Sequence, residues 1–422
     1  MTERADRRFL VKVLRQAFEY FAHESDEDSG LVLDKTKGEF ASIAAVGFGL
    51  SVYPIGVERG YWSRKKAIAR TLAALRFFRE SAQGKERDAT GYKGFYYHFL
   101  DMTSGRRAAR SELSTIDTAI LIAGALMAAT YFDRANADER EIRRSAEDLF
   151  ARVDWRWMLD AHKLLRHGWK PESGFIPHVW SGYNEAHVLY LLGLASPTST
   201  LPKASYRAWT DTFEWRTVFG QSYFHAAPLF IHQLSQTWFD LRSIRDAATR
   251  RRKLSYFENS RRATYAQQAY AIRNPGRFEH YGERSWGLTA SDGPGPSVRT
   301  IGGRRIRFFD YVARGIPEGP DDGTLAPWSV VSSLPFAPEI VIPTARHFED
   351  VHLRERRPYG FRATFNATYP HTKGVGWVSP HHFALNEGPV VMMIENHLSG
   401  FCWELGRRCV SFKRGLERGG FA

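Results

Sequence analysis

Helical segments that are apolar on every side alternate in this chain with segments that are apolar on one face only. Residues 114–132 are almost wholly apolar, whereas residues 139–153 carry one polar face. A helix that is apolar all round must be buried, and an amphipathic helix can cover it from outside. The alternation therefore predicts helical hairpins in which outer helices surround inner ones, and it favours a ring of such hairpins.

Apolar residues recur at helical spacing over most of the 422 residues. We expect Pro343 to kink or break one of these helices. No repeat of fixed length, as a solenoid would have, and no domain linker is visible, so we predict a single all-α domain over 1–422. The predicted helices span 9–21, 42–52, 62–78, 114–132, 139–153, 184–194, 227–246, 259–273, 326–334, 337–348 and 389–405.

The stretch 276–327 is rich in Gly and Pro and predicts long loops, which in a compact enzyme are more often functional than idle. Within it, residues 298–311 have the pattern of a short β-hairpin with Gly302-Gly303 as its turn.

The chain is basic, with 59 Lys and Arg against 46 Asp and Glu, a net charge of +13. The charge is diffuse: the densest runs are RRRK at 250–253 and RRIR at 304–307, and no zinc-finger or RNA-binding signature accompanies them. A solvated face is favoured over nucleic-acid binding, and anionic substituents on a substrate are the weaker alternative. Serine-nucleophile and nucleotide-binding motifs are missing as well, which argues against an esterase, a kinase or a dehydrogenase.

The first 21 residues carry charges within their apolar stretch and lack a small-residue cleavage site, so they do not resemble a secretory signal. No apolar run approaches the roughly 20 residues that a membrane span needs. We expect a cytoplasmic protein, or a periplasmic one if the sequence has been trimmed. Cys402 and Cys409 are compatible with a disulfide or with free thiols.

Two segments place carboxylates where apolar helices begin: SELSTIDTA at 111–119 and WSGYNEAHVLY at 180–190. A lone carboxylate there complements the helix dipole. Two such starts, together with FYYHFLD at 95–101 and WGLTASD at 286–292, are typical of a pocket that cleaves carbohydrate. Glycoside hydrolysis requires two carboxyl groups beside the scissile bond, and aromatic rings would hold the sugars.

Glu185 is the first candidate for a catalytic carboxyl, because neighbouring rings can raise its pKa toward that of a general acid. Asp117 fits a capping box with Ser114 and is either structural or catalytic. On a regular helix Glu112 and Asp117 would lie about 140° apart at roughly 3.6 residues per turn, so they share a pocket only if Glu112 precedes the helix. Asp292 is either a turn residue or a substrate-facing carboxylate.

Seven further residues near these carboxylates are candidates for substrate binding. His98 can alternatively be a core histidine. His381-His382 lacks a second ligand pair at zinc spacing, so neither a metal nor another cofactor is predicted. The candidates are Trp180, Tyr183, Tyr96, His98, Asp101, Arg107 and Trp286.

Five ordered runs carry a resemblance to a known family: GFYYHFLDMTSGRR, ELSTIDTAILIAGAL, WSGYNEAHVLYLLGLASPTSTLP, WGLTASDGP and DGTLAPWSVVSSLPFAPE. The chain resembles the bacterial glucoamylase-like family of enzymes that act on β-1,2-glucan. The resemblance implies an (α/α)6 toroid with its pocket at one end. It also implies an inverting hydrolase that cleaves β-1,2-glucan internally to short sophoro-oligosaccharides.

In this interpretation Glu185 is the general acid, and Glu112, Asp117 or Asp292 is the base or orients it. Transglycosylation on the same glucan, an exo-acting enzyme and a non-catalytic glucan-binding relative are the alternatives. One departure stands out: where the family tends to carry small residues after DGT-x-AP, this chain has Trp328, which is expected to reshape a subsite.

Overall fold

The computed structural model describes residues 2–354, 358–370 and 374–422. Helices dominate this part of the chain, as predicted. Their bounds are α1 (Thr2–His23), α2 (Ile43–Glu58), α3 (Arg64–Glu80), α4 (Thr115–Tyr131), α5 (Ala137–Arg152), α6 (His187–Ala195), α7 (Lys203–Thr210), α8 (Ala247–Arg252), α9 (Tyr256–Arg273), α10 (Pro327–Val331), α11 (Pro338–Asp350), α12 (Ala384–Leu398), α13 (Phe401–Arg408) and α14 (Val410–Gly419), with short 3₁₀ helices η1 (Trp155–Met158), η2 (Leu229–His232) and η3 (Leu234–Thr237).

The strands are short and pair antiparallel in small ladders that bring loops together. The pairs are β1 (Phe40–Ser42) with β4 (Phe99–Asp101), β2 (Gly91–Tyr92) with β3 (Phe95–Tyr96), β5 (Leu113–Ser114) with β6 (Gly168–Lys170), β6 with β7 (Gly174–Phe175), β8 (Trp215–Val218) with β9 (Gln221–Phe224), β10 (Ala290–Ser291) with β13 (Val312–Ala313), β11 (Ser297–Ile301) with β12 (Arg304–Phe308), and β15 (Phe365–Asn366) with both β14 (Thr324–Leu325) and β16 (Trp377–Val378).

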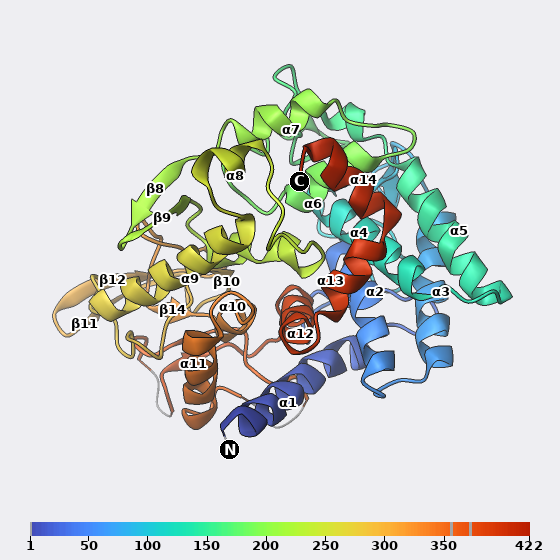
Figure 1. Cartoon of the computed structure of the whole chain (residues 1–422). Coiled ribbons are helices and arrows are strands. Elements are labelled where there is room, and N and C mark those ends of the chain that lie inside the picture. Colours follow the sequence, from blue (N-terminus) through green and yellow to red (C-terminus); the bar gives the residue numbers. More distant parts are fainter. Residues whose placement is uncertain (1, 355–357, 371–373) are drawn as a thin grey trace.

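The inner layer of the ring consists of helices that are buried along almost their whole length, among them α2, α4, α6 and α12. Helix α2 packs on α4, α12 and α3, and α4 packs on α6 and α5. Figure 1 shows α3 and α5 outside α2 and α4, in the outer layer. The predicted all-α fold, an (α/α)6 toroid, is therefore confirmed.

Two glycines allow the innermost helices to approach closely. A Cβ on Gly124 would lie 2.0 Å from the carbonyl oxygen of Gly47, and a Cβ on Gly47 would lie 2.4 Å from that of Ile120. No side chain larger than hydrogen fits at this crossing of α2 and α4. Gly47 and Gly124 are thus what allows α2 and α4 to pack closely.

Two predicted helices differ from the observed ones, and one expected helix break is absent. The helix predicted over 227–246 is wrong: the chain forms η2 and η3 there, and the Gln236 amide donates to the His232 carbonyl oxygen. Buried side chains that bond to the backbone in this way compete with regular helix formation. The helix over 389–405 is divided at Gly400, whose φ of +73° ends α12. Pro343, by contrast, does not interrupt α11.

The predicted hairpin is present as β11 and β12, with Gly302 and Gly303 at the turn. Cys402 and Cys409 are both buried free thiols. In the ranges that the structure describes, no helix is both long enough and apolar enough to cross a bilayer.

Candidate active site

A cavity of about 440 Å³ collects side chains from nine separate segments of the chain. Four carboxylates line it, and five aromatic side chains form much of its wall. The carboxylates are Asp34, Asp117, Glu185 and Asp292, and the aromatic residues are Phe99, Phe230, Tyr311, Trp328 and Phe383. Carboxyl groups facing one another across an aromatic-lined cavity are what a carbohydrate-cleaving site requires.

Glu185 lies two residues before α6, and the neighbouring 3₁₀ helix η3 fixes its backbone. The Ser235 hydroxyl donates to the Glu185 carbonyl oxygen at 2.7 Å and accepts from the Val188 N–H at 3.0 Å. The Glu185 carboxyl itself receives no hydrogen bond from another described side chain. Burial, reinforced by the negative charge of Asp117, raises the pKa of Glu185 to about 7. A carboxyl group with this pKa is suited to donate a proton near neutral pH.

His98 joins two of the predicted carboxylates. Its Nδ1 lies 3.2 Å from Glu112 Oε1 and 3.7 Å from Asp117 Oδ2. Burial alone would lower the pKa of His98, but Asp117, Glu112 and Asp34 together raise it to about 9. In turn, the hydrogen bond from His98 is the main cause that lowers the pKa of Glu112. His98 is therefore a cation of the site rather than a neutral core residue near pH 7.

The spatial relation of Glu112 and Asp117 follows from where α4 begins. Ser114 caps α4 and accepts from the Asp117 N–H at 3.2 Å, so the predicted cap is present. Glu112 precedes the helix, and both carboxylates reach His98 from opposite sides of the cap. Asp117 lines the cavity directly. Glu112 does not line it, and contacts His98, which does.

Asp34 is a cavity carboxylate that sequence reasoning missed. Burial raises its pKa against the opposing charges of His98 and Lys35. Its main chain is fixed by an N–H that donates to the Phe40 carbonyl oxygen and by a carbonyl that accepts from Ala384 N–H. The only signal in the sequence is an Asp directly after the apolar triplet at 31–33, which is common in loops.

Asp292 is held by hydroxyl groups on both of its oxygens. Thr364 Oγ1 donates to Oδ1 at 2.8 Å, and Ser379 Oγ donates to Oδ2. Asp292 directly follows β10, and the register of Ser291 opposite Val312 places it beside Tyr311 at the end of the ladder. The two hydroxyl donors thus fix the orientation of the Asp292 carboxylate in the cavity.

A buried ion pair stabilises the loop that carries Asp292. Arg314 and Asp322 are both 0% exposed and form two hydrogen bonds of 2.8 Å. The Arg314 guanidinium also donates to the carbonyl oxygens of Ser291 at 2.7 Å and Phe309 at 3.0 Å. Arg314 thereby ties together the loops that carry Asp292 and Tyr311.

Replacement of Arg314 by Met is expected to lower the free energy of unfolding by about 3–5 kcal/mol, because it leaves the Asp322 carboxylate buried without its partner. Chemical denaturation of the two proteins measures this difference. The control is Arg216→Met, which removes a pair with Glu318 at the surface and is expected to cost less than about 1 kcal/mol. Equal losses in both variants would contradict the assigned role of the buried pair.

Tyr311 and Trp328 are aromatic residues of the cavity that were not among the predicted binding residues. Tyr311 is 65% exposed, yet burial within the surrounding protein and the charges of four carboxylates raise its pKa to about 12. A side chain that is open to solvent and still surrounded by protein stands inside a concave site. Trp328 is 6% exposed, and its indole N–H donates to no acceptor among the described residues.

Six of the seven predicted binding residues do not line the cavity; His98 does. Tyr96 and Trp286 are fully buried and donate to the Phe78 carbonyl oxygen and to Thr344. Trp180 is 7% exposed and donates to Thr115, at the start of α4. These three side chains brace the segments that carry the carboxylates.

The other three also have structural partners. Tyr183 is 6% exposed and packs on His232 and Phe213 behind Glu185. Asp101 accepts from the Ser104 N–H and hydroxyl, and Arg107 pairs with Glu172.

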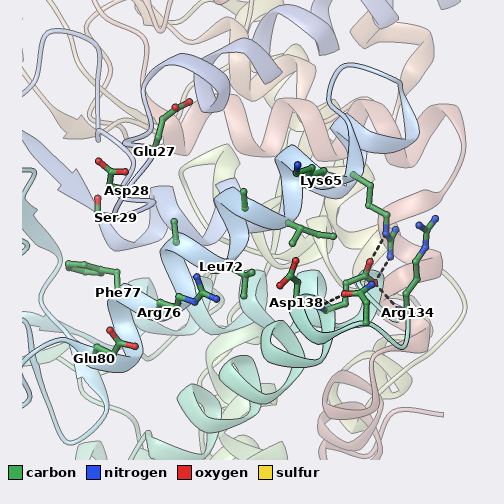
Figure 2. Close-up of a pocket in the computed structure, with 16 residues that line it drawn as sticks. Glu27, Asp28, Ser29, Lys65, Leu72, Arg76, Phe77, Glu80, Arg134 and Asp138 are labelled. Atoms are coloured by element: carbon green, nitrogen blue, oxygen red, sulfur yellow. Dashed lines mark hydrogen bonds and ion pairs between the residues drawn. The ribbon is translucent and has the colours of Figure 1, made fainter.

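A larger hollow of about 950 Å³ lies on the outer layer, between α3, α5 and residues 27–29 (Figure 2). Its charged residues are of both signs, and several are paired with one another: Arg64 donates to both carboxylate oxygens of Glu139. Phe77 is the only aromatic residue in its lining. The described lining of this hollow thus lacks the aromatic wall of the smaller cavity.

Comparison with known proteins finds relatives that match nearly the whole chain. A curated relative, the exo β-1,2-glucooligosaccharide sophorohydrolase (non-reducing end) of Parabacteroides distasonis, is 28% identical over 98% of this chain; the chain spans 58% of that relative. A solved "putative glucoamylase" from Bacteroides uniformis is 29% identical with a TM-score of 0.86, covering 99% of this chain and 98% of that one. A β-1,2-glucanase structure from Parabacteroides distasonis is 26% identical with a TM-score of 0.83, covering 98% and 60%.

The family model described as "Putative glucoamylase" matches residues 177–410, which include Glu185 and Asp292 and make up more than half of the chain. The fold and the sequence thus lead to one assignment: this chain belongs to the glucoamylase-like family.

Proposed function

We propose that this protein is a glycoside hydrolase that cleaves β-1,2-glucan internally and inverts the anomeric centre. The observation that carries the proposal is one cavity holding Glu185, with a pKa raised to about 7, and Asp292, which accepts hydroxyl hydrogen bonds on both oxygens. Glu185 can thus supply a proton near neutral pH, and the oriented Asp292 carboxylate supplies the second carboxyl group that glycoside hydrolysis requires. The names of the relatives supply the linkage of the glucan.

In the proposed mechanism the protonated Glu185 carboxyl donates to the leaving glycosidic oxygen. Because no described side chain forms a hydrogen bond with the Glu185 carboxyl, its proton is free to point into the cavity. Departure of the leaving group builds positive charge on the sugar ring, and the carboxylates of Asp34 and Asp117 stabilise that charge electrostatically.

Asp292 acts as the general base in this proposal. Thr364 and Ser379 orient its carboxylate, which removes a proton from the water that attacks the anomeric carbon from the opposite face. The product therefore has the inverted configuration, and each carboxyl group returns to its starting state by proton exchange with water.

The cavity wall offers a donor and apolar faces for glucose rings. The Trp328 indole N–H, which is buried and has no partner among the described residues, is placed to donate to a sugar hydroxyl. Phe99, Phe383 and Tyr311 supply ring faces against which the C–H side of a sugar can pack.

Internal cleavage is supported by the shape of the site. Tyr311 lines the cavity and also lines a second hollow of about 730 Å³ along the β11–β12 hairpin, so a chain can extend beyond the catalytic carboxyls. The exo-acting relative favours the alternative of releasing sophorose from the non-reducing end.

Product sizing over time separates these outcomes. Linear β-1,2-glucan cut internally gives a ladder of sophoro-oligosaccharides early in the reaction, whereas sophorose alone would indicate exo action. Products longer than an oligosaccharide substrate would instead indicate transfer. Proton NMR of the first product tests inversion: we expect the α-anomer to form first, and the β-anomer would contradict it.

Replacement of Asp117 by Asn is expected to shift the alkaline limb of the kcat–pH profile toward lower pH, by about 0.5–1 unit. Glu185 must be protonated to act as an acid, so activity falls as pH rises through its pKa of about 7. The Asp117 charge contributes to raising that pKa, and removing the charge lowers it. Asp211→Asn, at an exposed ion pair, is the control. If the alkaline limb of Asp117→Asn stays at the same pH or moves to higher pH, the proposed effect of Asp117 on the pKa of Glu185 is contradicted.

A further inference from the structure

The second hollow, called here the hairpin groove, is built by β11, β12 and the residues that lead from β12 to β13. It has a volume of about 730 Å³ and shares Tyr311 with the catalytic cavity. No residue of the hairpin groove other than Tyr311 lines that cavity. Tyr311 is therefore the residue that the two hollows share.

The hairpin is an antiparallel ribbon with one packed face and one free face. Ile306 and Phe308 are 8% and 0% exposed and pack with Phe278 in a small core of their own. The register pairs Val298 with Arg307 and Thr300 with Arg305, so these four side chains alternate with the packed ones and lie on the other face. Val298 is 50% exposed there. In Figure 1 the ribbon projects from the body beyond the helices.

The free face carries positive charge that the described protein leaves largely uncompensated. The Arg305 side chain makes no hydrogen bond or ion pair with any residue in the described ranges. Arg307 lies over the Phe309 ring at 5.1 Å, which orders its guanidinium without neutralising it. Asp310 is the one carboxylate in the lining, so two guanidinium groups outnumber it.

We propose that the hairpin groove binds the part of a long glucan chain that extends out of the catalytic cavity past Tyr311, and that Arg305 and Arg307 select chains bearing anionic substituents there. This inference rests on the proposed function and adds to it a substrate class. An exposed aromatic ring in the same hollow as two guanidinium groups offers a stacking surface for a sugar and charge-assisted hydrogen bonds for an attached anion.

The test compares three substrates with the double variant Arg305→Gln/Arg307→Gln: a short sophoro-oligosaccharide, long linear β-1,2-glucan, and the same long glucan after partial succinylation. We expect the KM for succinylated glucan to rise about tenfold at low salt, because two solvent-exposed charge contacts are lost. The kcat for all three substrates and the KM for the short oligosaccharide should remain unchanged, since neither arginine lines the catalytic cavity. Added salt should reduce the difference.

The matched control is Arg7→Gln/Arg8→Gln, which removes the same charge from exposed positions on α1 and should leave all three KM values unchanged. An unchanged KM for succinylated glucan in the groove variant would overturn the proposal. An equal rise in KM for the short oligosaccharide would overturn it as well. An equal rise in KM for the unmodified and the succinylated long glucan would overturn the selectivity for anions.

Dissociation constants of the long glucans for Glu185→Gln, with and without the arginine changes, keep this test separate from catalysis. Weaker binding of succinylated glucan without any turnover in the native protein would contradict the proposed hydrolase and still support the groove. Turnover of β-1,2-glucan, together with binding of succinylated glucan that the arginine changes do not alter, would support the hydrolase and overturn the groove.

Discussion

Glu185→Gln is expected to lower kcat on β-1,2-glucan by about 10³–10⁴-fold, at the upper end of what a general acid contributes. Glutamine has nearly the same shape and cannot donate the proton that the leaving oxygen needs. Steady-state kinetics on the wild type and the variant measure the loss. Because substrate contacts are preserved, KM should change far less than kcat.

Stability measurements distinguish a catalytic loss from a folding defect in this variant. The pKa of Glu185 rises from 4.5 to about 7 on folding, so the native protein loses stability as pH rises from 4.5 through 7, and the cost is complete above 7. Glutamine carries no such cost, and Glu185→Gln should be more stable than the wild type at pH 8. An inactive variant that is also less stable at pH 8 would contradict the assigned role.

Asp292→Asn is expected to lower kcat by about 10²–10⁴-fold, because an amide cannot remove the proton from the attacking water. Thr364 can still donate to the amide oxygen, and the Ser379 hydroxyl can accept from the amide nitrogen in place of donating, so the loop should keep its conformation. Steady-state kinetics with unfolding curves beside them measure both effects.

Chemical rescue gives a sharper test of the base. In Asp292→Ala the missing carboxylate leaves space for a small anion, and azide should restore turnover by attacking the anomeric carbon without deprotonation. The same addition to Asp117→Ala should have no effect, because Asp117 is not proposed to act on water. Rescue of Asp117→Ala in place of Asp292→Ala would reassign the base.

The lack of a fixed-length repeat and the family resemblance were also needed to predict the ring. Helical periodicity by itself predicted the buried inner helices and the amphipathic outer ones. It failed over 227–246, where apolar and aromatic spacing hid buried Gln and Ser side chains that bond to the backbone and hold short 3₁₀ turns. That failure matters for the site, since Ser235 in η3 is what fixes the backbone of Glu185.

The carboxylates were easier to predict than the aromatic contacts. Glu185 and Asp117 stand at helix starts, where a sequence pattern marks them. Tyr96 and Trp286 stand in equally suggestive segments, yet both are fully buried. Which ring faces a cavity depends on how distant segments meet, and a single sequence does not carry that information. Asp34 and Tyr311 reach the cavity only because small β-ladders bring their loops there.

The central claim is hydrolysis of β-1,2-linked glucan by the carboxyl groups of one cavity. Its most direct test incubates the purified protein with linear β-1,2-glucan beside β-1,3-, β-1,4- and α-1,4-glucans, with Glu185→Gln in parallel, and sizes the products. We predict short oligosaccharides from the β-1,2 polymer alone, and none with the variant. Release of sugars from another polymer in preference, or equal release by Glu185→Gln, would contradict the account.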